Sequence, residues 1–462
     1  MDRVAETYLV RERYFNRDTD RPKDTYGFFL ACLILGLAFF LDAPWGRAFY
    51  SYTPITETLG AFYFSSFSDS FGVPGISVSP FELLSIILAG GALFKVVPSL
   101  PDDTSKNIFI AMIASLALIF VAGISSGWAH GNNSRVMLTQ FRSIITLPLW
   151  LIIGTTFLTS QKRAWIFLSV IASATFAKSL QGLWNYFYIL GGQRGSQEFI
   201  IEHITSSSIV TAVMVINALI WLKDMNLVKK ILLSFSANSV LVFVFLANDR
   251  RAALVGLGMG LVMILISLPL KFYRRHFLGM SGVLLIGVLY LVATWDTSGA
   301  LGFPARAFKS LMDPSESSSG YRQVENANMF FSIANEPLTG LGFGRRFPVV
   351  FPLPDISTVY NEYDLVPHNT LLFVWTFAGP LGIAGLGTFF ALALGLALRI
   401  FRGSRSTGGC FLGAIAALVL IQGLSYIYAD IGLREVRLLA EVGGVSGYLV
   451  ALSQLSLKEG DI

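Results

Sequence analysis

The stretch NIFIAMIASLALIFVAGI, residues 107–124, contains no charged side chain. A helix of about 20 mostly apolar residues crosses the hydrocarbon core of a bilayer, and this stretch is close to that length. Eleven further apolar runs recur along the 462 residues. They lie at approximately 27–41, 80–98, 137–160, 164–190, 205–222, 230–247, 252–270, 277–295, 380–400, 408–428 and 437–455. The pattern predicts an all-α, polytopic membrane protein with about twelve transmembrane helices.

The composition supports this prediction. Hydrophobic residues make up 54% of the chain and charged residues 14%, whereas soluble domains carry about 25% charged residues. The formal net charge is +5, but the basic residues fall singly or in twos and threes between the apolar runs. That distribution is typical of a membrane protein, so we expect a lipid bilayer and no nucleic acid as partner. Cys32 and Cys410 form no Cys-x-x-Cys or Cys/His cluster, which disfavours disulfides and structural zinc.

The basic residues also predict an orientation. If the polar N-terminal tail is cytoplasmic, 19 Lys and Arg fall on the cytoplasmic side and 12 on the outer side, where the loops are longer. Because short basic loops stay inside, both chain ends should be cytoplasmic. The tail lacks the shape of a cleavable signal peptide. The expected divisions are a cytoplasmic tail (1–26), nine transmembrane helices (27–295), a large outer loop (296–367), an interfacial helix with three further transmembrane helices (368–455) and a cytoplasmic tail (456–462).

The large loop of 72 residues is the expected location of a functional site. A three- and four-residue spacing of Tyr321, Val324, Ala327, Phe331 and Ala334 predicts an amphipathic helix over 321–334 that lies against the membrane domain. Three glycines follow it, and they favour a tight turn over a phosphate-binding loop because the strand and helix of a nucleotide-binding loop are absent. These glycines are Gly340, Gly342 and Gly344.

The segment from His368 to Ile400 is too long for one span, and Gly379-Pro380 interrupts it. We expect a short helix at the outer interface over residues 368–378, begun by Pro367, and a transmembrane helix over 381–400. His368 would then lie at a helix N-terminus. The positive end of the helix dipole disfavours imidazolium there, and a neutral imidazole can act as a general base. A single histidine is more often structural, and His130 and His203 also face outward.

Arg250 and Arg251 lie at the outer surface, where the seventh apolar run ends and the eighth begins. Two cations can lie at this level simply because their side chains extend to the interface. Positive charge on this side nevertheless runs against the orientation bias. Together with Arg322, these residues offer guanidinium groups that bind pyrophosphate oxygens in bidentate fashion.

Other charged residues are weaker candidates. Arg142 and Lys178 fall within predicted spans, which indicates either function or displaced helix boundaries. Three carboxylates precede His368 in sequence, and a solvated loop charge is the default interpretation for each of Glu336, Glu362 and Asp364. Carboxylates at metal-ligand spacing are absent from the sequence, so we predict no metal site and no cofactor.

Two motifs resemble the bacterial O-antigen ligase and polymerase superfamily. They are NEPLTGLGFG at 335–344 and PHNTLLFVWTFAGPLG at 367–382. The RRAAL sequence at 250–254 and Arg322 are also similar to that family's two functional arginines. The resemblance covers roughly residues 200–400. It implies a multi-pass, GT-C-like glycosyltransferase of the bacterial inner membrane whose large loop and active face are periplasmic.

The resemblance further implies metal-independent transfer, with inversion, of a glycan from an undecaprenyl-pyrophosphate carrier to an acceptor hydroxyl. His368 is similar to the proposed base and Arg322 to an arginine that contacts donor phosphates. Arg250 resembles the second arginine, although the doubled Arg250-Arg251 leaves the register open by one. A ligase acting on lipid A–core, a polymerase of O-antigen or exopolysaccharide, and a protein glycosyltransferase would share these features.

A transporter or flippase of lipid-linked sugars is the competing class, since it would share the spans and the outer cations. Transporters usually contain internal repeats and broken helices with a site near mid-membrane. The sequence contains no evident repeat, and its polar candidates gather at one face. These two features favour an enzyme.

Overall fold

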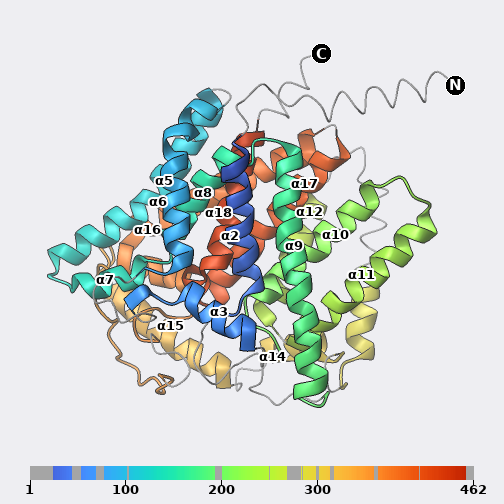
Figure 1. Ribbon diagram of the computed structural model, residues 1–462. Coiled ribbons are helices and arrows are strands. Elements are labelled where there is room, and N and C mark those ends of the chain that lie inside the picture. The colour runs from blue at the N-terminus through green and yellow to red at the C-terminus, as the bar shows by residue number, and fades with distance from the viewer. Residues whose placement is uncertain are drawn as a thin grey trace.

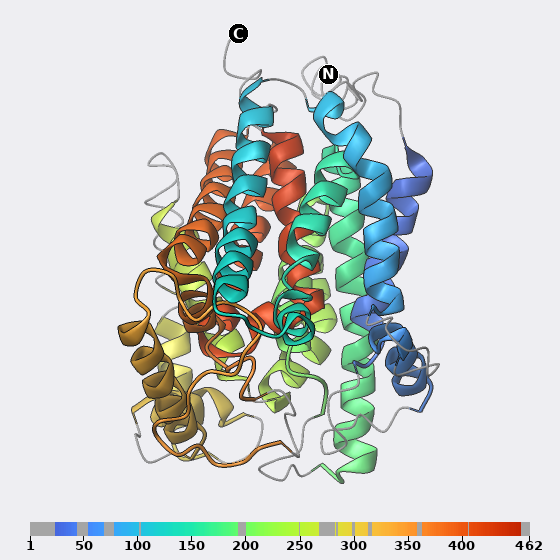
Figure 2. The ribbon, with the colours of Figure 1, turned by 90° about the vertical axis from the view of Figure 1, so that its left-hand side faces the viewer.

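The computed structural model describes residues 24–43, 54–68, 78–100, 103–192, 200–248, 250–267, 282, 285–297, 301–312, 317–357, 363–404 and 406–453. These residues form helices and loops without a β-strand, which confirms the predicted all-α class. Long helices run side by side and make a bundle, and shorter helices gather at one end (Figures 1 and 2). The first half of the bundle contains α2 (Thr25–Phe40), α3 (Pro54–Phe64), α5 (Pro80–Ser99), α6 (Asp103–Ala129), α7 (Ser134–Phe141), α8 (Thr146–Phe157) and α9 (Gln161–Trp184). The second half contains α10 (Thr205–Leu222), α11 (Leu227–Asn248), α12 (Arg251–Ile266), α14 (Phe303–Met312), α15 (Ser317–Asn335), α16 (Thr370–Gly403), α17 (Thr407–Ala429) and α18 (Val436–Leu452).

The helices make this a polytopic membrane protein. Among the described residues, six helices are long and apolar enough to span a bilayer: Asp103–Ala129, Gln161–Ile189, Thr205–Leu222, Leu227–Asn248, Thr370–Gly403 and Thr407–Ala429. A seventh span results if α7 and α8, which are bent by 45° at a short break, count as one. Two further apolar helices, α2 and α12, have 16 residues each. The predicted span at 277–295 lies partly outside the described residues.

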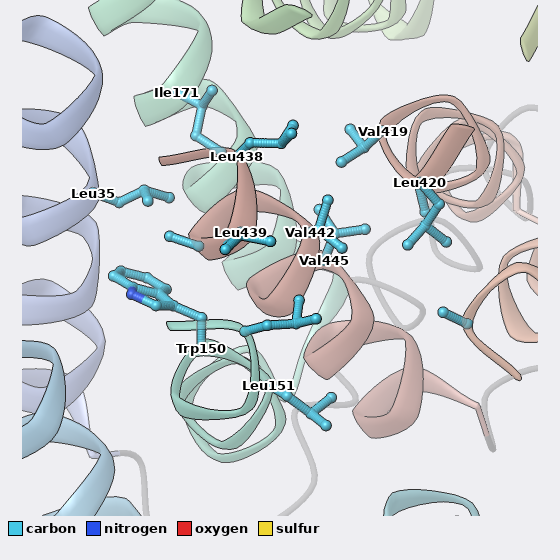
Figure 3. Packing of buried hydrophobic residues seen from close by; sticks show 14 of the residues in the cluster. Leu35, Trp150, Leu151, Ile171, Val419, Leu420, Leu438, Leu439, Val442 and Val445 are labelled. Carbon is cyan, nitrogen blue, oxygen red and sulfur yellow. The ribbon is translucent and has the colours of Figure 1, made fainter. Parts of the chain in front are cut away.

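The core forms where α18 packs against α8. Trp150 and Leu151 of α8 meet Leu439, Val442 and Val445 of α18, with α2, α9 and α17 around them (Figure 3). The backbones come close because small residues face each other, since a Cβ atom built on Gly154 would lie 2.4 Å from the carbonyl oxygen of Gly444. Helices in lipid associate mainly by such close packing, because the lipid is as apolar as their side chains.

The start of α2 and the end of α18 lie at the same end of the bundle. Lys95 near the end of α5 pairs with Asp24 before α2 at 2.6 Å, and a short connection leads from α5 to α6. The hydroxyl of Ser105 in α6 lies 2.8 Å from that of Ser453 after α18. The start of α2 and the end of α18 are therefore on the same side of the bundle. The candidate site described below lies at the opposite end.

The predicted break at Gly379-Pro380 is present. Gly379 has φ 62° and ψ −165°, which divides α16 into two helical segments. The first segment begins two residues later than predicted. Asn369 is the N-cap, its side chain accepting from the backbone N–H of Leu372 at 3.1 Å, so the helix begins at Thr370 and not at His368. Phe373 and Phe377 are buried within the protein, because the first segment packs against the loop of residues 336–347.

Candidate functional site

Helix α15 contains the predicted helix 321–334, but it presents a different face to the protein. The spacing predicted that Val324, Ala327 and Phe331 would face the membrane domain, whereas Phe331 is 41% exposed. The buried face contains Glu325, Asn328, Met329 and Ser332. Polar side chains can be buried on this face because each is hydrogen-bonded. Asn328 accepts from the backbone N–H groups of Val350 and Phe351, both at 2.7 Å, and this holds the helix in place.

His368 is held by the buried carboxylate of Glu325. The backbone N–H of His368 donates to Oε2 of Glu325 at 2.9 Å, and Nδ1 of the imidazole lies 3.2 Å from Oε1. The imidazole is 20% exposed and the carboxylate is 0% exposed. The ring of Tyr321, one turn before Glu325, meets the imidazole edge-on with centroids 5.5 Å apart. The position of His368 is thus set by α15, and the ring precedes the N-cap of α16 by one residue.

Arg250 is positioned by the junction of α11, α12 and α17. Asn248 at the end of α11 donates from its side chain to the hydroxyl of Ser206 at 2.8 Å, which ties this turn to α10. On the other side, Ser425 of α17 donates to the carbonyl of Ala252 at 2.7 Å. Arg250 itself is the N-cap of α12, with an extended backbone conformation. The turn is therefore fixed on both sides, which directs Arg250 to the end of the bundle.

Asp430, directly after α17, marks the centre of the candidate site. Burial acts to raise the pKa of this carboxyl, but the surrounding positive and titratable groups outweigh burial and hold the pKa below its usual value. These groups are Arg322, His203, His368 and Arg250. Nδ1 of His203 lies 3.9 Å from Oδ2 of Asp430. The structure thus brings together three of the predicted site residues, which come from three separate elements.

His203 belongs to the same cluster. Partial burial of the ring lowers the pKa of His203 below its usual value, and Arg250 lowers it further, while Asp430 acts in the opposite direction. The guanidinium groups of Arg250 and Arg322 lie near the carboxylate of Asp430, and such groups bind the oxygens of a polyanion such as pyrophosphate. Arg250 acts on both His203 and Asp430, and Arg251 follows it as the first residue of α12.

The glycine motif is a structural turn, as the sequence indicated. Gly379-Pro380 interrupts α16 and leaves helical carbonyls that the loop satisfies: the N–H groups of Leu341 and Gly342 donate to the carbonyls of Thr376 and Phe377 at 2.8 and 3.0 Å. Asn132 donates to the loop from the other side, reaching the Leu341 carbonyl at 3.0 Å. These N–H groups are occupied by protein, so they do not cradle phosphate. The motif at 335–344 packs on the motif at 367–382, because its backbone N–H groups bind the carbonyls that the helix break leaves without a helical partner.

Gly342→Ala should destabilise the protein. Gly342 has φ 72°, and an added Cβ would lie 2.1 Å from the backbone nitrogen of Gly127. The positive φ alone costs about 1–2 kcal/mol for a residue with a side chain, and the backbone overlap adds to it. Gly131→Ala is the matched control, because Gly131 has φ 67° with nothing within 4 Å of its Cβ position. Thermal unfolding in detergent should show a clearly larger loss for Gly342→Ala, and equal losses would contradict the close approach.

The two cations predicted within spans form ion pairs with carboxylates. Arg142 lies in the break between α7 and α8 and contacts both carboxylate oxygens of Glu82, at 2.6 and 2.5 Å. Lys178 is fully buried in α9 and pairs with Asp42. Arg142 is the C-cap of α7, so the helix is interrupted at this residue within the predicted span 137–160. Because a buried cation needs a partner, both pairs have an evident structural role near the candidate site's end of the bundle.

The remaining loop carboxylates differ from one another. Asp364 is largely buried and pairs with Arg346, so its interpretation as a solvated charge was wrong. Glu336 is half-exposed, with Oε1 4.0 Å from Nε2 of His130. Glu362 lies outside the described residues. Arg437, counted above among the outer loop charges, is buried at the start of α18 and pairs with Glu202.

Glu325, His203 and Asp430 are site residues that the sequence analysis missed. Glu325 follows Arg322 by three positions, a helical spacing that brings the two residues close together and could have been used. Asp430 ends the eleventh apolar run on the outer side, and an acidic residue at that level was a signal that could have been used. Within the described parts of the chain, His, Cys, Asp and Glu form no group of three or more that could hold a metal ion.

The fold and the cluster define a polytopic membrane protein with a charged site at one end of its bundle. The chain is 25% identical over 277 residues to a protein named O-antigen ligase from Salmonella typhimurium, a match that covers 57% of this chain and 63% of that protein. This similarity confirms the resemblance found in the motifs and supports membership of the O-antigen ligase family. No protein-family model matches the chain. The match to the Salmonella protein spans less than two thirds of that protein's length.

Proposed function

We propose that this protein is an inverting membrane glycosyltransferase that moves a glycan from undecaprenyl pyrophosphate to an acceptor hydroxyl. The observation that supports this most is the cluster at one end of the bundle, where two arginines and two histidines from separate elements act on Asp430. A lipid pyrophosphate is already an activated leaving group. Transfer therefore requires a base, alignment of the two substrates and stabilisation of charge on the departing pyrophosphate.

The reaction would proceed as a single displacement. His368 accepts the proton of the acceptor hydroxyl, the acceptor oxygen forms a bond to the anomeric carbon, and the bond from that carbon to the pyrophosphate oxygen breaks. Undecaprenyl pyrophosphate leaves with the electron pair, its charge stabilised by Arg250 and Arg322. The imidazolium then returns its proton to water. Attack opposite the leaving group inverts the anomeric configuration, and the steps proposed here need no metal.

We place the site at the periplasmic face of the inner membrane. The bias of basic loops assigns the start of α2 to the cytoplasm. The cluster lies at the opposite end of the bundle. In this arrangement α2, α5, α12, α18 and the run at 277–295 complete twelve spans. The donor would reach the site from the bilayer. The acceptor would be lipid A–core in a ligase or a second glycan in a polymerase.

The orientation predicts where fusions to a phosphatase that works only outside the cytoplasm will be active. A fusion at residue 316, in the large loop, should be active, and a fusion at Arg274 should be inactive. Both positions lie outside the described residues, so this prediction rests on the charges of the loops alone. Activity at 274 together with inactivity at 316 would invert the orientation.

A transfer assay tests the function itself. Purified protein in liposomes that contain undecaprenyl-pyrophosphate-linked glycan and an acceptor should yield glycosylated acceptor with inverted anomeric configuration. The competing flippase would move the donor between leaflets without forming this product. Donor translocation without product would favour the transporter, and product with retained configuration would exclude a single displacement.

A further inference from the structure

A fully buried carboxylate contacts the proposed base at two points. The Glu325 side chain is 0% exposed and bridges two parts of His368: its Oε2 accepts from the backbone N–H at 2.9 Å, and its Oε1 lies 3.2 Å from Nδ1 of the ring. Burial of a charged side chain is costly unless the charge is paired and hydrogen-bonded. The two contacts compensate that cost, and both of them are made to the residue on which the proposed chemistry depends.

We propose that Glu325 is a positioning residue that fixes the tautomer and orientation of His368 for proton abstraction, an inference that rests on the proposed transferase function. Because Nδ1 faces the carboxylate, the proton of the neutral ring is held on Nδ1. Nε2 is then the nitrogen that accepts the proton of the acceptor hydroxyl. The carboxylate also stabilises the imidazolium that forms when Nε2 takes this proton, as in other histidine bases paired with a buried carboxylate.

The surroundings make this pairing rigid. Asn328, one turn beyond Glu325, accepts from the N–H groups of Val350 and Phe351 and donates to the Phe351 carbonyl at 2.9 Å, so α15 is clamped to the loop. The ring of Tyr321 packs against one side of the imidazole. A carboxylate held in this way loses little freedom when the reaction begins, which is the condition for electrostatic preorganisation.

Other charged and titratable groups also act near His368, and a change in pH dependence has to be interpreted with them. Arg322 and Tyr321 lie beside Glu325 on α15, while three groups approach from other elements: Arg250 before α12, His203 before α10 and Asp430 after α17. Tyr363 and Asp364 act on Tyr321 from the loop. Of the carboxylates named here, Glu325 is the one that contacts the Nδ1 atom of His368.

Glu325→Gln tests the proposal, because the amide keeps the size of the side chain and an oxygen for the backbone N–H but removes the charge. Measured with purified protein in the transfer assay, kcat should fall about 10- to 100-fold, a part of what a general base contributes, with little change in KM for the donor. The acidic limb of the pH–rate profile should move to lower pH, because an imidazolium without its carboxylate is less stable. Glu325→Asp keeps the charge and should retain more activity than Glu325→Gln.

Asp355→Asn is the control, since it removes an exposed carboxylate from the loop that contacts α15 and should leave kcat and the pH profile unchanged. Thermal unfolding of each variant separates misfolding from altered chemistry. If wild type transfers glycan, His368→Ala does not, and Glu325→Gln has a normal kcat and an unchanged acidic limb, the positioning role is wrong while the proposed function stands. If wild type forms no product, the proposed function itself fails.

Discussion

His368→Ala is expected to lower the rate of glycan transfer by about 100- to 10,000-fold, the usual contribution of a positioned general base. The donor should still bind, because the two arginines that would hold its pyrophosphate are unchanged. The measurement is single-turnover transfer with purified protein, alongside binding of the lipid-linked donor. This prediction rests on the contact of the imidazole with Glu325 and on its action, together with Arg250 and Arg322, on Asp430.

The matched control is His130→Ala. His130 also lies at this end of the bundle, but its Nδ1 is 2.8 Å from the carbonyl of Ser126 within its own helix. Its removal should leave transfer close to wild type. Near-normal transfer by His368→Ala would instead assign the base to a carboxylate such as Glu336 or Glu362.

Arg322→Ala and Arg250→Ala should each reduce transfer on the order of 100- to 1,000-fold without loss of folded protein, because each removes a preorganised positive charge from the departing pyrophosphate. Arg→Lys should rescue poorly, since an ammonium lacks the planar fork that binds two phosphate oxygens. The measurements are kcat and donor affinity for each variant. We expect Arg251→Ala to have a smaller effect than Arg250→Ala, because Arg250 acts on His203 and Asp430.

Arg135→Ala provides the control for charge alone, because Arg135 is an exposed arginine in the first turn of α7. It should transfer glycan at the wild-type rate. Full activity in Arg322→Ala would remove that residue from the site, and an equal loss in Arg135→Ala would indicate a general electrostatic effect of the surface.

Much of the fold could be predicted because its signals are local. An apolar run without charges, such as 107–124, indicates a helix in lipid whatever surrounds it, and α6 covers that run. The break at Gly379-Pro380 was equally local, since proline lacks the N–H that a continuous helix needs. The start of that helix was missed by two residues, because Asn369 caps it and Pro367 remains outside.

The parts of the site that escaped prediction depend on contacts between distant segments. Glu325 and His368 are 43 positions apart, and their pairing exists because the loop between them folds back on α15. The buried face of α15 is polar for the same reason, so an apolar periodicity selected the wrong face. Arg250, Arg322 and His368 were nevertheless identifiable, because their charge or placement ran against what the membrane alone requires.

In the proposed mechanism, this end of the bundle transfers glycan with its own histidine and arginines. The most direct test is the transfer reaction with purified wild-type protein, undecaprenyl-pyrophosphate-linked glycan and acceptor in the presence of EDTA. We predict that product forms at the rate seen without the chelator. Transfer that is abolished by EDTA and restored by a divalent ion would contradict this mechanism.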